Sequence, residues 1–525
     1  MLAPIGAVWA TSPTVTLSPS ATVIGSSTSG LDIFRGIPFA QPPVESLRFR
    51  PPRPMETPLG SFDATSQPRA CPQFLAQADL SQVPTGVLGE LLNTPLFQSI
   101  TNAGEDCLTL DVIRPSNVSA SDKLPVIVWI YGGAYASGST QSYNLSGLAS
   151  DSINLSRPVI FVAANYRVGG FGFLAGKELL RDGSTNLGLL DQRLSLEWVA
   201  DNIEAFGGDP TKVTLFGESA GSISVFTQLA LYGGDNTYKG KPLFRAAIMD
   251  SGCVQPALAA DSETAQEIYD NAVRHAGCSS AEDTLECLRQ VDYTTLLNAL
   301  NSVPGLLSYQ SIVLRYLPRP DGKVLPDAME TLAQQGRFAK VPFIIGDQED
   351  EGTFFALQTS NVTTPADAYP EDPAAGSPYG TGLKNNWYPQ FKRMASIMGD
   401  TAFLMTRRAF LDASKSTHPD VPFWSFLSSY FHDIPILGTF HGSDLLLLMN
   451  GIGPSAAADA IKSYYFSFVY ELDPNVGSGL ISWPQWTENK ELLHFTQEGA
   501  TGLITDTFRQ EAYEIISTQL SSLSL

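Results

Sequence analysis

A serine between two glycines is the feature of this sequence with the clearest chemistry. Ser219 lies in Gly-Glu-Ser-Ala-Gly, residues 217–221, directly after an apolar run at residues 213–216 and before a helical stretch at residues 222–229. A serine hydroxyl is a weak nucleophile and needs an adjacent base. A tight turn from a strand into a helix exposes the hydroxyl, and flanking glycines permit close backbone packing. The motif predicts a nucleophilic serine; the alternative is a glycine-rich turn around a buried serine.

A glycine-rich turn upstream of Ser219 has the composition of a second part of such a site. Residues 131–135 read Tyr-Gly-Gly-Ala-Tyr and follow an apolar run that ends at Ile130. Glycine lets the backbone approach a substrate carbonyl closely. The N–H of Ala220, at the start of the following helix, is expected to point at the negative charge that develops on attack. An ordinary Gly-Gly turn is the alternative for residues 131–135.

The elements that must position these residues alternate between strands and helices. Short runs that are apolar on both faces are typical of a mainly parallel sheet covered by helices. They occupy residues 125–130, 159–164, 213–216, 244–249, 343–345 and 423–427. Further segments are expected to be helical, at residues 187–205, 265–276 and 506–523. We therefore expect one α/β domain over residues 1–525, with a large central, mostly parallel sheet flanked by helices.

The charge of the chain excludes two classes of partner. With 32 basic and 53 acidic residues, the formal net charge is −21. Such a surface repels nucleic acid and anionic membranes, so neither is an expected partner. No run of eighteen apolar residues occurs, so no integral membrane segment is expected.

Cysteines and glycosylation sequons favour a secreted, extracellular glycoprotein. The chain has five cysteines, so at least one thiol is free or intermolecular. Four asparagines begin an Asn-x-Ser/Thr sequon: Asn117, Asn144, Asn154 and Asn361. Residues 1–13 lack the basic start and the full apolar stretch of a signal peptide, but residues 7–10 resemble the end of one. Residues 1–13 are therefore interpreted as a signal-peptide remnant.

Several segments together resemble the type-B carboxylesterase family, which contains cholinesterases and fungal lipases. They are the stretches Phe-Arg-Gly-Ile-Pro-Phe-Ala-Gln-Pro-Pro, Glu-Asp-Cys-Leu, Asn-Tyr-Arg-Val and Asn-Leu-Gly-Leu-Leu-Asp-Gln-Arg, at residues 34–43, 105–108, 165–168 and 186–193. The resemblance runs from about residue 30 to the C-terminus and is strongest to the fungal lipase and sterol esterase branch. It implies the α/β-hydrolase fold.

The resemblance also supplies the two partners of Ser219. The family pattern Asp-Glu-Gly makes Glu351 the acid, within Gly-Asp-Gln-Glu-Asp-Glu-Gly at residues 346–352. The family's histidine loop matches residues 438–444 and makes His441 the base, although composition alone leaves His432 as a rival. The chain order serine, acid, histidine is that of the fold. The other acids near Glu351 are expected to form a solvated loop: Asp347, Glu349 and Asp350.

The mechanism implied is ester hydrolysis through an acyl-enzyme, with no metal or organic cofactor. By family alignment, the backbone N–H groups of Gly133, Ala134 and Ala220 bind the oxyanion. Two departures from the fungal lipases stand out. Alanine replaces the third glycine of the usual Gly-Gly-Gly at position 134, which is expected to narrow the pocket, and the stretch after Val362 lacks a helical segment.

Disulfides and internal ion pairs are implied by the same resemblance. Cys71 is expected to pair with Cys107, and Cys278 with Cys287, which leaves Cys253 free and packed as a small apolar residue. The ion pairs Arg48–Glu105 and Arg167–Asp191 are expected to be structural.

The loop at residues 72–106 is the segment that best indicates the class of substrate. Within it, residues 84–93 predict a helix with one apolar face made of Val87, Leu88, Leu91 and Leu92. In the fungal lipases the matching loop is a mobile lid that opens on a lipid aggregate; the alternative is a helix docked permanently on the core. The loop has no tryptophan, unlike the loop with which cholinesterases bind choline.

We therefore expect a hydrolase for apolar esters of the lipase or sterol esterase type, active at a lipid–water interface. A carboxylesterase for short or aromatic esters is the first alternative, and an inactive binding relative is the second. Such inactive relatives usually lack the serine or the histidine, whereas Ser219 and His441 are both present. The lid face is also a candidate surface for the association of two copies of the chain.

Overall fold

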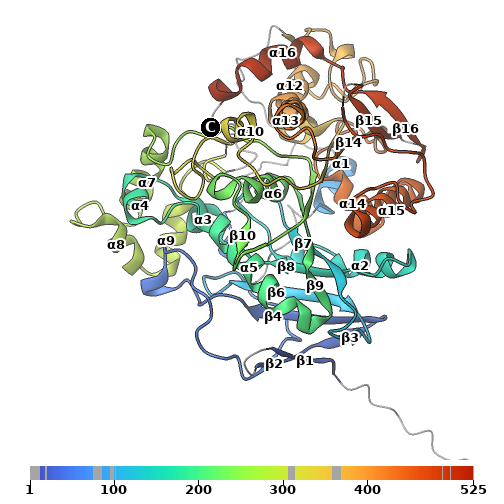
Figure 1. The fold of residues 1–525 in the computed structure, drawn as a ribbon. Coiled ribbons are helices and arrows are strands. Elements are labelled where there is room, and N and C mark those ends of the chain that lie inside the picture. The colour runs from blue at the N-terminus through green and yellow to red at the C-terminus, as the bar shows by residue number, and fades with distance from the viewer. Residues whose placement is uncertain are drawn as a thin grey trace, which may run out of the picture.

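An eleven-stranded sheet runs through the middle of the molecule in the computed structural model of the protein (Figure 1). The structure describes residues 12–17, 21–74, 85–94, 100, 102–305, 314–357, 368–487, 489–496 and 498–523. The strand order is β16-β15-β14-β13-β12-β9-β7-β8-β6-β4-β3. In that order the strands are Thr501–Thr505, Glu491–Phe495, Phe423–Ser428, Phe343–Gln348, Ala246–Asp250, Gly208–Glu218, Leu124–Ile130, Ile160–Ala164, Thr109–Pro115, Leu31–Pro38 and Ser26–Thr28.

The sheet is parallel in its centre and antiparallel at its edges. Six neighbouring pairs, from β15 to β8, are parallel. The pair β15–β16 and the three pairs beyond β8 are antiparallel. Central strands such as β8 and β12 are buried along their whole length. Continuous apolar runs belong in such strands because helices cover both faces of a parallel sheet. The predicted mostly parallel sheet is confirmed, and each predicted apolar run overlaps one of these strands.

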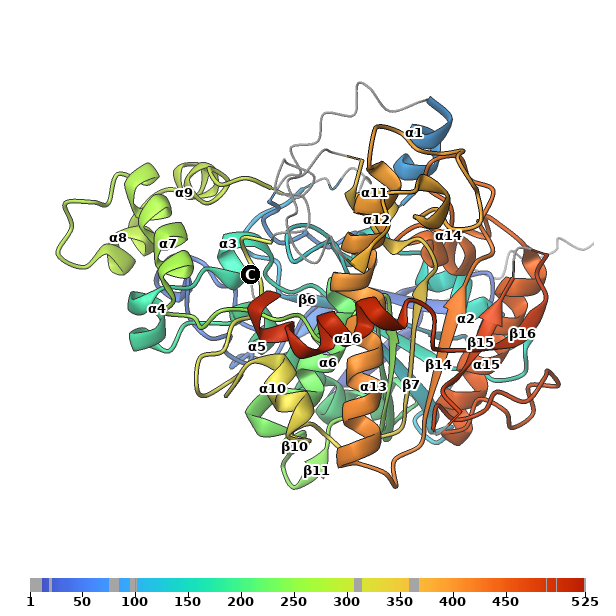
Figure 2. The same ribbon diagram turned by 90° about the horizontal axis from the view of Figure 1, so that it is seen from above.

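Helices cover both faces of the sheet. α2 and α15 pack against β6, β7 and β8 on one face, while α5 and α6 pack against β9 on the other, with α10 and α13 outside α6 (Figure 2). The helices α1 to α8 are Thr85–Leu92, Leu145–Asn154, Gly169–Phe173, Lys177–Asp182, Leu187–Asn202, Ala220–Ala230, Glu263–His275 and Thr284–Gln290. The helices α9 to α16 are Tyr293–Leu300, Met329–Gln334, Glu351–Phe355, Phe391–Gly399, Met405–Thr417, Ser443–Asn450, Ser455–Glu471 and Gln510–Thr518.

Two smaller sheets lie outside the central one. The first has the order β1-β2-β5, with strands Thr14–Leu17, Ala21–Ile24 and Ser61–Asp63. The second is the hairpin of β10, Thr237–Tyr238, and β11, Lys241–Pro242. Among the described residues, no helix has the length and apolar character needed to cross a membrane.

The C-terminal helix begins later than predicted. The sequence favoured a helix over residues 506–523, but the chain turns after β16, forms α16 over Gln510–Thr518, and ends in a 3-10 turn at Leu520–Leu523. Asp506 is fully buried and accepts hydrogen bonds from the side chains of Arg407 and Arg408. The chain therefore turns inward at Asp506 before the helix can start.

Both implied disulfides form. Cys71 bonds to Cys107 and closes the loop that contains α1, and Cys278 bonds to Cys287. Cys253 is free and buried, and burial raises the pKa of its thiol to about 12, so it is protonated and unreactive. The two implied ion pairs are also present and buried, Arg48–Glu105 and Arg167–Asp191.

The sequons differ in their surroundings. Asn117 and Asn154 are exposed, and their side chains make no hydrogen bond among the described residues. Asn144 is exposed as well, but its side chain accepts from Gly147 N at the start of α2 and donates to Met449 O. Asn361 lies outside the described residues, as do residues 362–367 and residues 1–11 of the N-terminal stretch 1–13.

Candidate active site

Ser219 stands in a sharp turn between β9 and α6. Its backbone has φ 56° and ψ −128°, a region that non-glycine residues seldom occupy. Such a turn needs glycine where its backbone contacts the backbone of a neighbouring strand. A Cβ on Gly221 would lie 2.0 Å from Ile130 O, so only glycine fits there. The backbone N–H of Ser219 donates to Asp250 O on β12 (2.9 Å), which ties the turn to the neighbouring strand.

His441 joins Ser219 to Glu351 through two short hydrogen bonds. Ser219 Oγ lies 2.8 Å from His441 Nε2, and His441 Nδ1 lies 2.6 Å from Glu351 Oε2. Glu351 is fully buried and its other oxygen accepts from Gln348 N (2.8 Å). With the acid on Nδ1, that nitrogen carries the proton and Nε2 is free to accept the serine proton. The structure thus brings together the three residues that the resemblance selected.

Asp350 fastens the acid loop to the histidine loop. Its carboxylate accepts from Thr439 N (3.0 Å), Ser377 Oγ (2.7 Å) and Tyr379 N (2.9 Å). Its own N–H donates to Thr439 O (3.0 Å). These bonds hold the residue before Glu351 next to the residues that precede His441. Asp350 is a positioning residue that the sequence reasoning missed.

The expectation of a solvated acidic loop around Glu351 is therefore wrong for two of its three acids. Asp350 is 1% exposed and Asp347 is 0% exposed. β13 continues to Gln348, further than the predicted run at residues 343–345, and carries Asp347 into the sheet. There Asp347 pairs with Arg407 Nε at 2.7 Å. Only Glu349 keeps partial exposure.

The turn after β7 lies beside the serine. Gly132 approaches it so closely that a Cβ there would be 2.9 Å from Ser219 Cβ. Gly133 and Ala134 both have positive φ, at 103° and 58°, and both line the pocket over Ser219. Among the described residues, the N–H groups of Gly133, Ala134 and Ala220 make no hydrogen bond. They are available to a substrate oxygen, as an oxyanion hole requires.

The pocket above Ser219 is small and partly closed by the end of the α1 segment. Its volume is about 50 Å³, which suits a few water molecules. Thr94, two residues after α1, is buried and lines it. The other described residues around it are Gly133, Ala134, Tyr143, Glu218, Ser219, Phe354, Phe355, His441, Gly442 and Leu445. An ester with a long acyl chain requires more room than this pocket has.

The apolar face of α1 is narrower than predicted. Val87 and Leu91 are buried, whereas Leu92 is 49% exposed. At 3.6 residues per turn, Leu92 stands about 140° round the helix from Val87, so it falls at the edge of the stripe. The side chain of Leu88 lies outside the described part of the structure. At its C-terminal end the helix contacts α14, where Asn450 Nδ2 donates to Asn93 O.

A buried group of acids lies behind the serine and histidine. Glu218 Oε1 is 3.6 Å from His441 Nε2, and Asp250 Oδ1 accepts from Tyr465 OH (2.7 Å). Neither oxygen of Asp444 has a hydrogen-bond donor among the described residues. Burial, and next the neighbouring acid Asp444, raise the pKa of Glu218 well above its ordinary value. Burial first, and then the charge of Glu351, raise the pKa of Asp444 to about 7.

These acids predict a pH dependence of stability. A carboxyl whose pKa is raised by folding binds its proton more tightly in the folded state, so its stabilising contribution is complete below its ordinary pKa of about 4 and is lost as the pH rises towards 7. We expect the urea midpoint of unfolding to fall between pH 5 and pH 8. In Asp444→Asn, the free energy of unfolding derived from these curves should fall less steeply with pH, by up to about 1.4 kcal/mol per pH unit. The exposed control Asp420→Asn should leave the slope unchanged. An equal slope in the Asp444 variant would contradict this expectation.

Two aromatic rings that the sequence reasoning missed contact the histidine. The ring of Phe355 lies 5.0 Å from the His441 ring, and that of Phe403 lies 4.6 Å from it. Phe355 follows the Asp-Glu-Gly pattern closely and could have been found from it. Phe403 has no such signal. The rival histidine, His432, contacts the carboxylate of Asp433 (3.1 Å) and neither Ser219 nor Glu351.

A mostly parallel sheet with a serine at a strand-to-helix turn defines the α/β-hydrolase fold. The sequence profile described as Carboxylesterase family matches residues 11–373. The chain belongs to this family and is a carboxylic ester hydrolase.

Named relatives agree with this assignment. The chain is 54% identical to Secreted lipase 1 of Botryotinia fuckeliana, over 98% of this chain and 94% of the relative. It is 43% identical to Lipase 4 of Diutina rugosa, over 98% of this chain and 97% of that relative. Among solved structures, EstA of Aspergillus niger superposes with a TM-score of 0.80 at 26% identity, covering 97% of this chain and 99% of EstA.

Proposed function

We propose that the protein is a secreted lipase that hydrolyses apolar carboxylic esters with Ser219 as nucleophile. The observation that carries the proposal is the unbroken hydrogen-bonded series from Ser219 Oγ through His441 to the buried Glu351. A secreted triacylglycerol lipase of Gibberella zeae, 52% identical over 96% of this chain and 90% of the relative, supports this substrate class.

The geometry supports a two-step reaction. His441 Nε2 takes the proton of Ser219 as the oxygen attacks the ester carbonyl, and Glu351 stabilises the imidazolium that results. The free N–H groups of Gly133, Ala134 and Ala220 bind the oxyanion. His441 then protonates the alcohol as it leaves. Water, activated by the same histidine, releases the acid from the acyl-enzyme and restores Ser219.

The small, partly closed pocket favours a lid that moves. A space of about 50 Å³ excludes a long acyl chain, and Thr94 at the end of the α1 segment forms part of its wall. We infer that α1 moves away at a lipid–water interface and lets the ester in. The buried apolar side chains of Val87 and Leu91 would then face the lipid.

Initial rates on p-nitrophenyl acetate, butyrate, laurate and palmitate test the substrate class. We expect higher kcat/KM on laurate and palmitate than on acetate. On tributyrin, we expect the rate to rise sharply once the substrate exceeds its solubility and forms an interface. A preference for acetate with no such rise would replace the lipase proposal with a carboxylesterase for short esters. If the enzyme is inert on every ester, a role in binding replaces both.

Secretion and glycosylation belong to the same proposal. The two disulfides, the exposed sequons at Asn117 and Asn154, and relatives named as secreted lipases support it. We expect the protein in the culture medium of its natural host, with a mass that falls on endoglycosidase treatment. Retention of the whole pool inside the cell would refute secretion.

We also infer that two copies associate through the face of α1. The exposed Leu92 is an apolar contact point on this face. Sedimentation velocity should show a dimer for the wild type and a monomer for Leu92→Asp. A monomeric wild type at all concentrations would refute the dimer.

A further inference from the structure

The His441 ring contacts two phenylalanine rings that come from different parts of the chain. Phe355 belongs to α11, the helix that starts with Glu351, whereas Phe403 comes from a distant part of the chain. The two phenyl rings lie 5.6 Å apart with an angle of 21° between their planes. Because both also contact the imidazole, its orientation depends on where Phe403 is placed.

Phe403 lies in a π-helical turn. Residues Asp400–Leu404 form this turn between α12 and α13, so one long helix contains a local change of winding. A π-turn inserts an extra residue, which rotates the side chains that follow relative to a regular α-helix, and such turns are frequent at functional sites. Here the turn contains the residue that touches the histidine. Other contacts must stabilise the π-helical turn, because π-helical winding is less favourable than α-helical winding.

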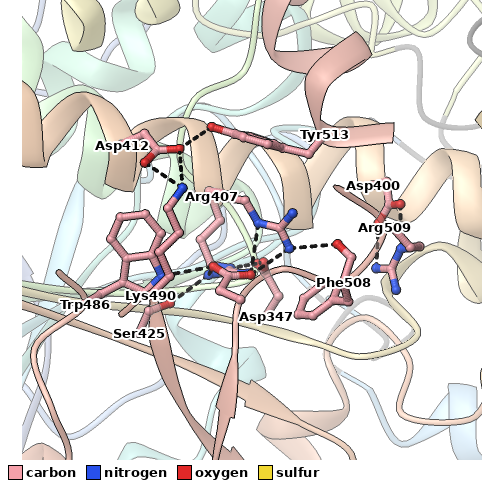
Figure 3. Close-up of polar contacts among 12 residues, drawn as sticks. Asp347, Asp400, Arg407, Asp412, Ser425, Trp486, Lys490, Phe508, Arg509 and Tyr513 are labelled. Atoms are coloured by element: carbon pink, nitrogen blue, oxygen red, sulfur yellow. Dashed lines mark hydrogen bonds and ion pairs between the residues drawn. The ribbon is translucent and has the colours of Figure 1, made fainter. Parts of the chain in front are cut away.

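The first residue of the turn is anchored by the C-terminal part of the chain. Asp400 is fully buried, and both its oxygens accept from Arg509, each at 2.8 Å. Tyr369 OH donates to the same carboxylate (2.7 Å), and the Arg509 guanidinium lies 4.3 Å from the centre of the Tyr379 ring. Figure 3 shows the Arg509 side chain directed at Asp400, apart from the larger group of polar contacts.

The other end of the turn is fixed from the same C-terminal segment. Arg407 and Arg408, at the start of α13, both donate to Asp506, and Arg408 also donates to Phe508 O (3.1 Å). Asp506 and Arg509 lie in one short connection between β16 and α16. This connection therefore holds the first residue of the turn and the residues just after its end. We call residues 506–509 the C-terminal clamp.

We propose that the C-terminal clamp positions His441: Arg509 fixes Asp400 at the start of the π-turn, and the turn places Phe403 against the imidazole. Phe403 and Arg509 are positioning residues for the reaction, and this inference rests on the proposed function of the triad. The ring contact also favours the imidazolium formed during attack, because an aromatic face attracts a cation within about 6 Å. The acids that face this imidazolium are Glu351 (2.6 Å), Glu218 (3.6 Å) and Asp444.

Phe403→Leu tests the contact with a matched control. Leucine keeps most of the apolar volume but removes the ring. Phe410→Leu makes the same change at another buried phenylalanine, which packs against Phe226, Phe338 and Phe343 and touches no triad residue. Active sites are counted by titration with a p-nitrophenyl phosphonate, so that kcat refers to competent enzyme only. If Phe403→Leu fails to fold, Phe403→Met replaces it.

For Phe403→Leu we expect kcat per active site to fall about 3- to 30-fold with KM little changed, the range that a ring–cation contact covers. The acid limb of the kcat/KM profile should move to lower pH, because the imidazolium loses a favourable contact while the acids around it remain. Phe410→Leu should lower the melting temperature without either change. The role of Phe403 would be overturned if the two variants had equal kcat and equal acid limbs. It would also be overturned if Phe403→Leu raised KM and left kcat unchanged.

Arg509 tests the remote part of the proposal. We expect Arg509→Gln to change kcat and the acid limb in the same direction as Phe403→Leu, and Arg509→Lys to fall between it and the wild type. If Arg509→Gln keeps the wild-type values per active site, the clamp does not position the histidine. An inert wild type would instead refute the proposed function, so the two failures are distinguishable.

Discussion

Replacing Ser219 with alanine lowers the turnover of p-nitrophenyl esters by about a million-fold, the loss seen when a triad nucleophile is removed. The reason is that no acyl-enzyme can form, so only the oxyanion donors and substrate binding remain to accelerate the attack of water. The backbone around position 219 is set by Gly221 and by the N–H bond to Asp250, both of which survive the change. The variant should therefore fold and bind ester while it turns over hardly any.

A serine in the helix that follows Ser219, α6, is the matched control. Ser224 is buried and its hydroxyl contacts Gln192 Nε2 (3.0 Å) and Tyr135 OH (3.3 Å), but it does not contact His441. Ser224→Ala should keep its rate within a few-fold of the wild type, measured as initial rates under the same conditions. A Ser219 variant that retains more than a hundredth of the rate would show that another group carries the reaction.

Replacing Asp506 with alanine is expected to cost about 3–5 kcal/mol of unfolding free energy, the penalty for removing one partner of a buried charge network. Its two oxygens accept from Arg407, from Arg408 and from Trp486 Nε1 (3.1 Å). Burial alone would raise the pKa of Asp506, but the two arginines together hold it below its ordinary value. Without Asp506, Asp347 is the one carboxylate among the described residues that still pairs with these two buried cations, and Arg408 loses its carboxylate partner.

An exposed ion pair gives the comparison. Asp327 and Arg337 are 3.9 Å apart with about two-fifths of each side chain exposed. Asp327→Ala should change the free energy of unfolding by about 1 kcal/mol or less. Both variants are compared by urea unfolding at one pH, followed by tryptophan fluorescence. Equal costs at the two positions would mean that burial of the network does not determine its contribution.

The parts of the fold that local patterns determine were predictable. Runs that are apolar on both faces located the central strands, because only a strand covered on both sides buries such a run. The turn at Ser219 was predictable for a similar reason: the glycines that it needs are adjacent in sequence, and the strand and helix that it joins are visible on either side. Glu351 and His441 came from the resemblance, since spacing left four acids and five histidines as candidates.

What the sequence did not reveal depends on contacts between distant residues. Asp347 and Asp350 look like a solvated acidic loop until Arg407 and Thr439 are brought to them. Phe403 has an ordinary apolar neighbourhood, and only the π-turn places it on the histidine. The sequence placed Asp506 at the start of a helix, because the two arginines that draw it into the core lie about a hundred residues earlier in the chain and leave no local signal. No local pattern records such partners.

The exposure of Leu92 is a smaller case of the same kind. Helical spacing placed four apolar residues on one face, but the packing of α1 decides which of them are buried: among those whose side chains the structure describes, Val87 and Leu91 are buried and Leu92 is exposed. The width of a buried stripe depends on the surface that the helix meets, which the helix's own sequence does not contain.

Covalent labelling of the nucleophile tests the central claim most directly. The protein is incubated with a p-nitrophenyl phosphonate, and p-nitrophenol release, intact mass and the tryptic peptide of residues 213–239 are followed together. We predict one adduct per chain, on Ser219 by fragmentation, formed at the rate at which ester hydrolysis is lost, and none in Ser219→Ala. Loss of hydrolysis with the adduct on another residue, or full labelling of Ser219 with hydrolysis intact, would contradict the assignment of Ser219 as the nucleophile.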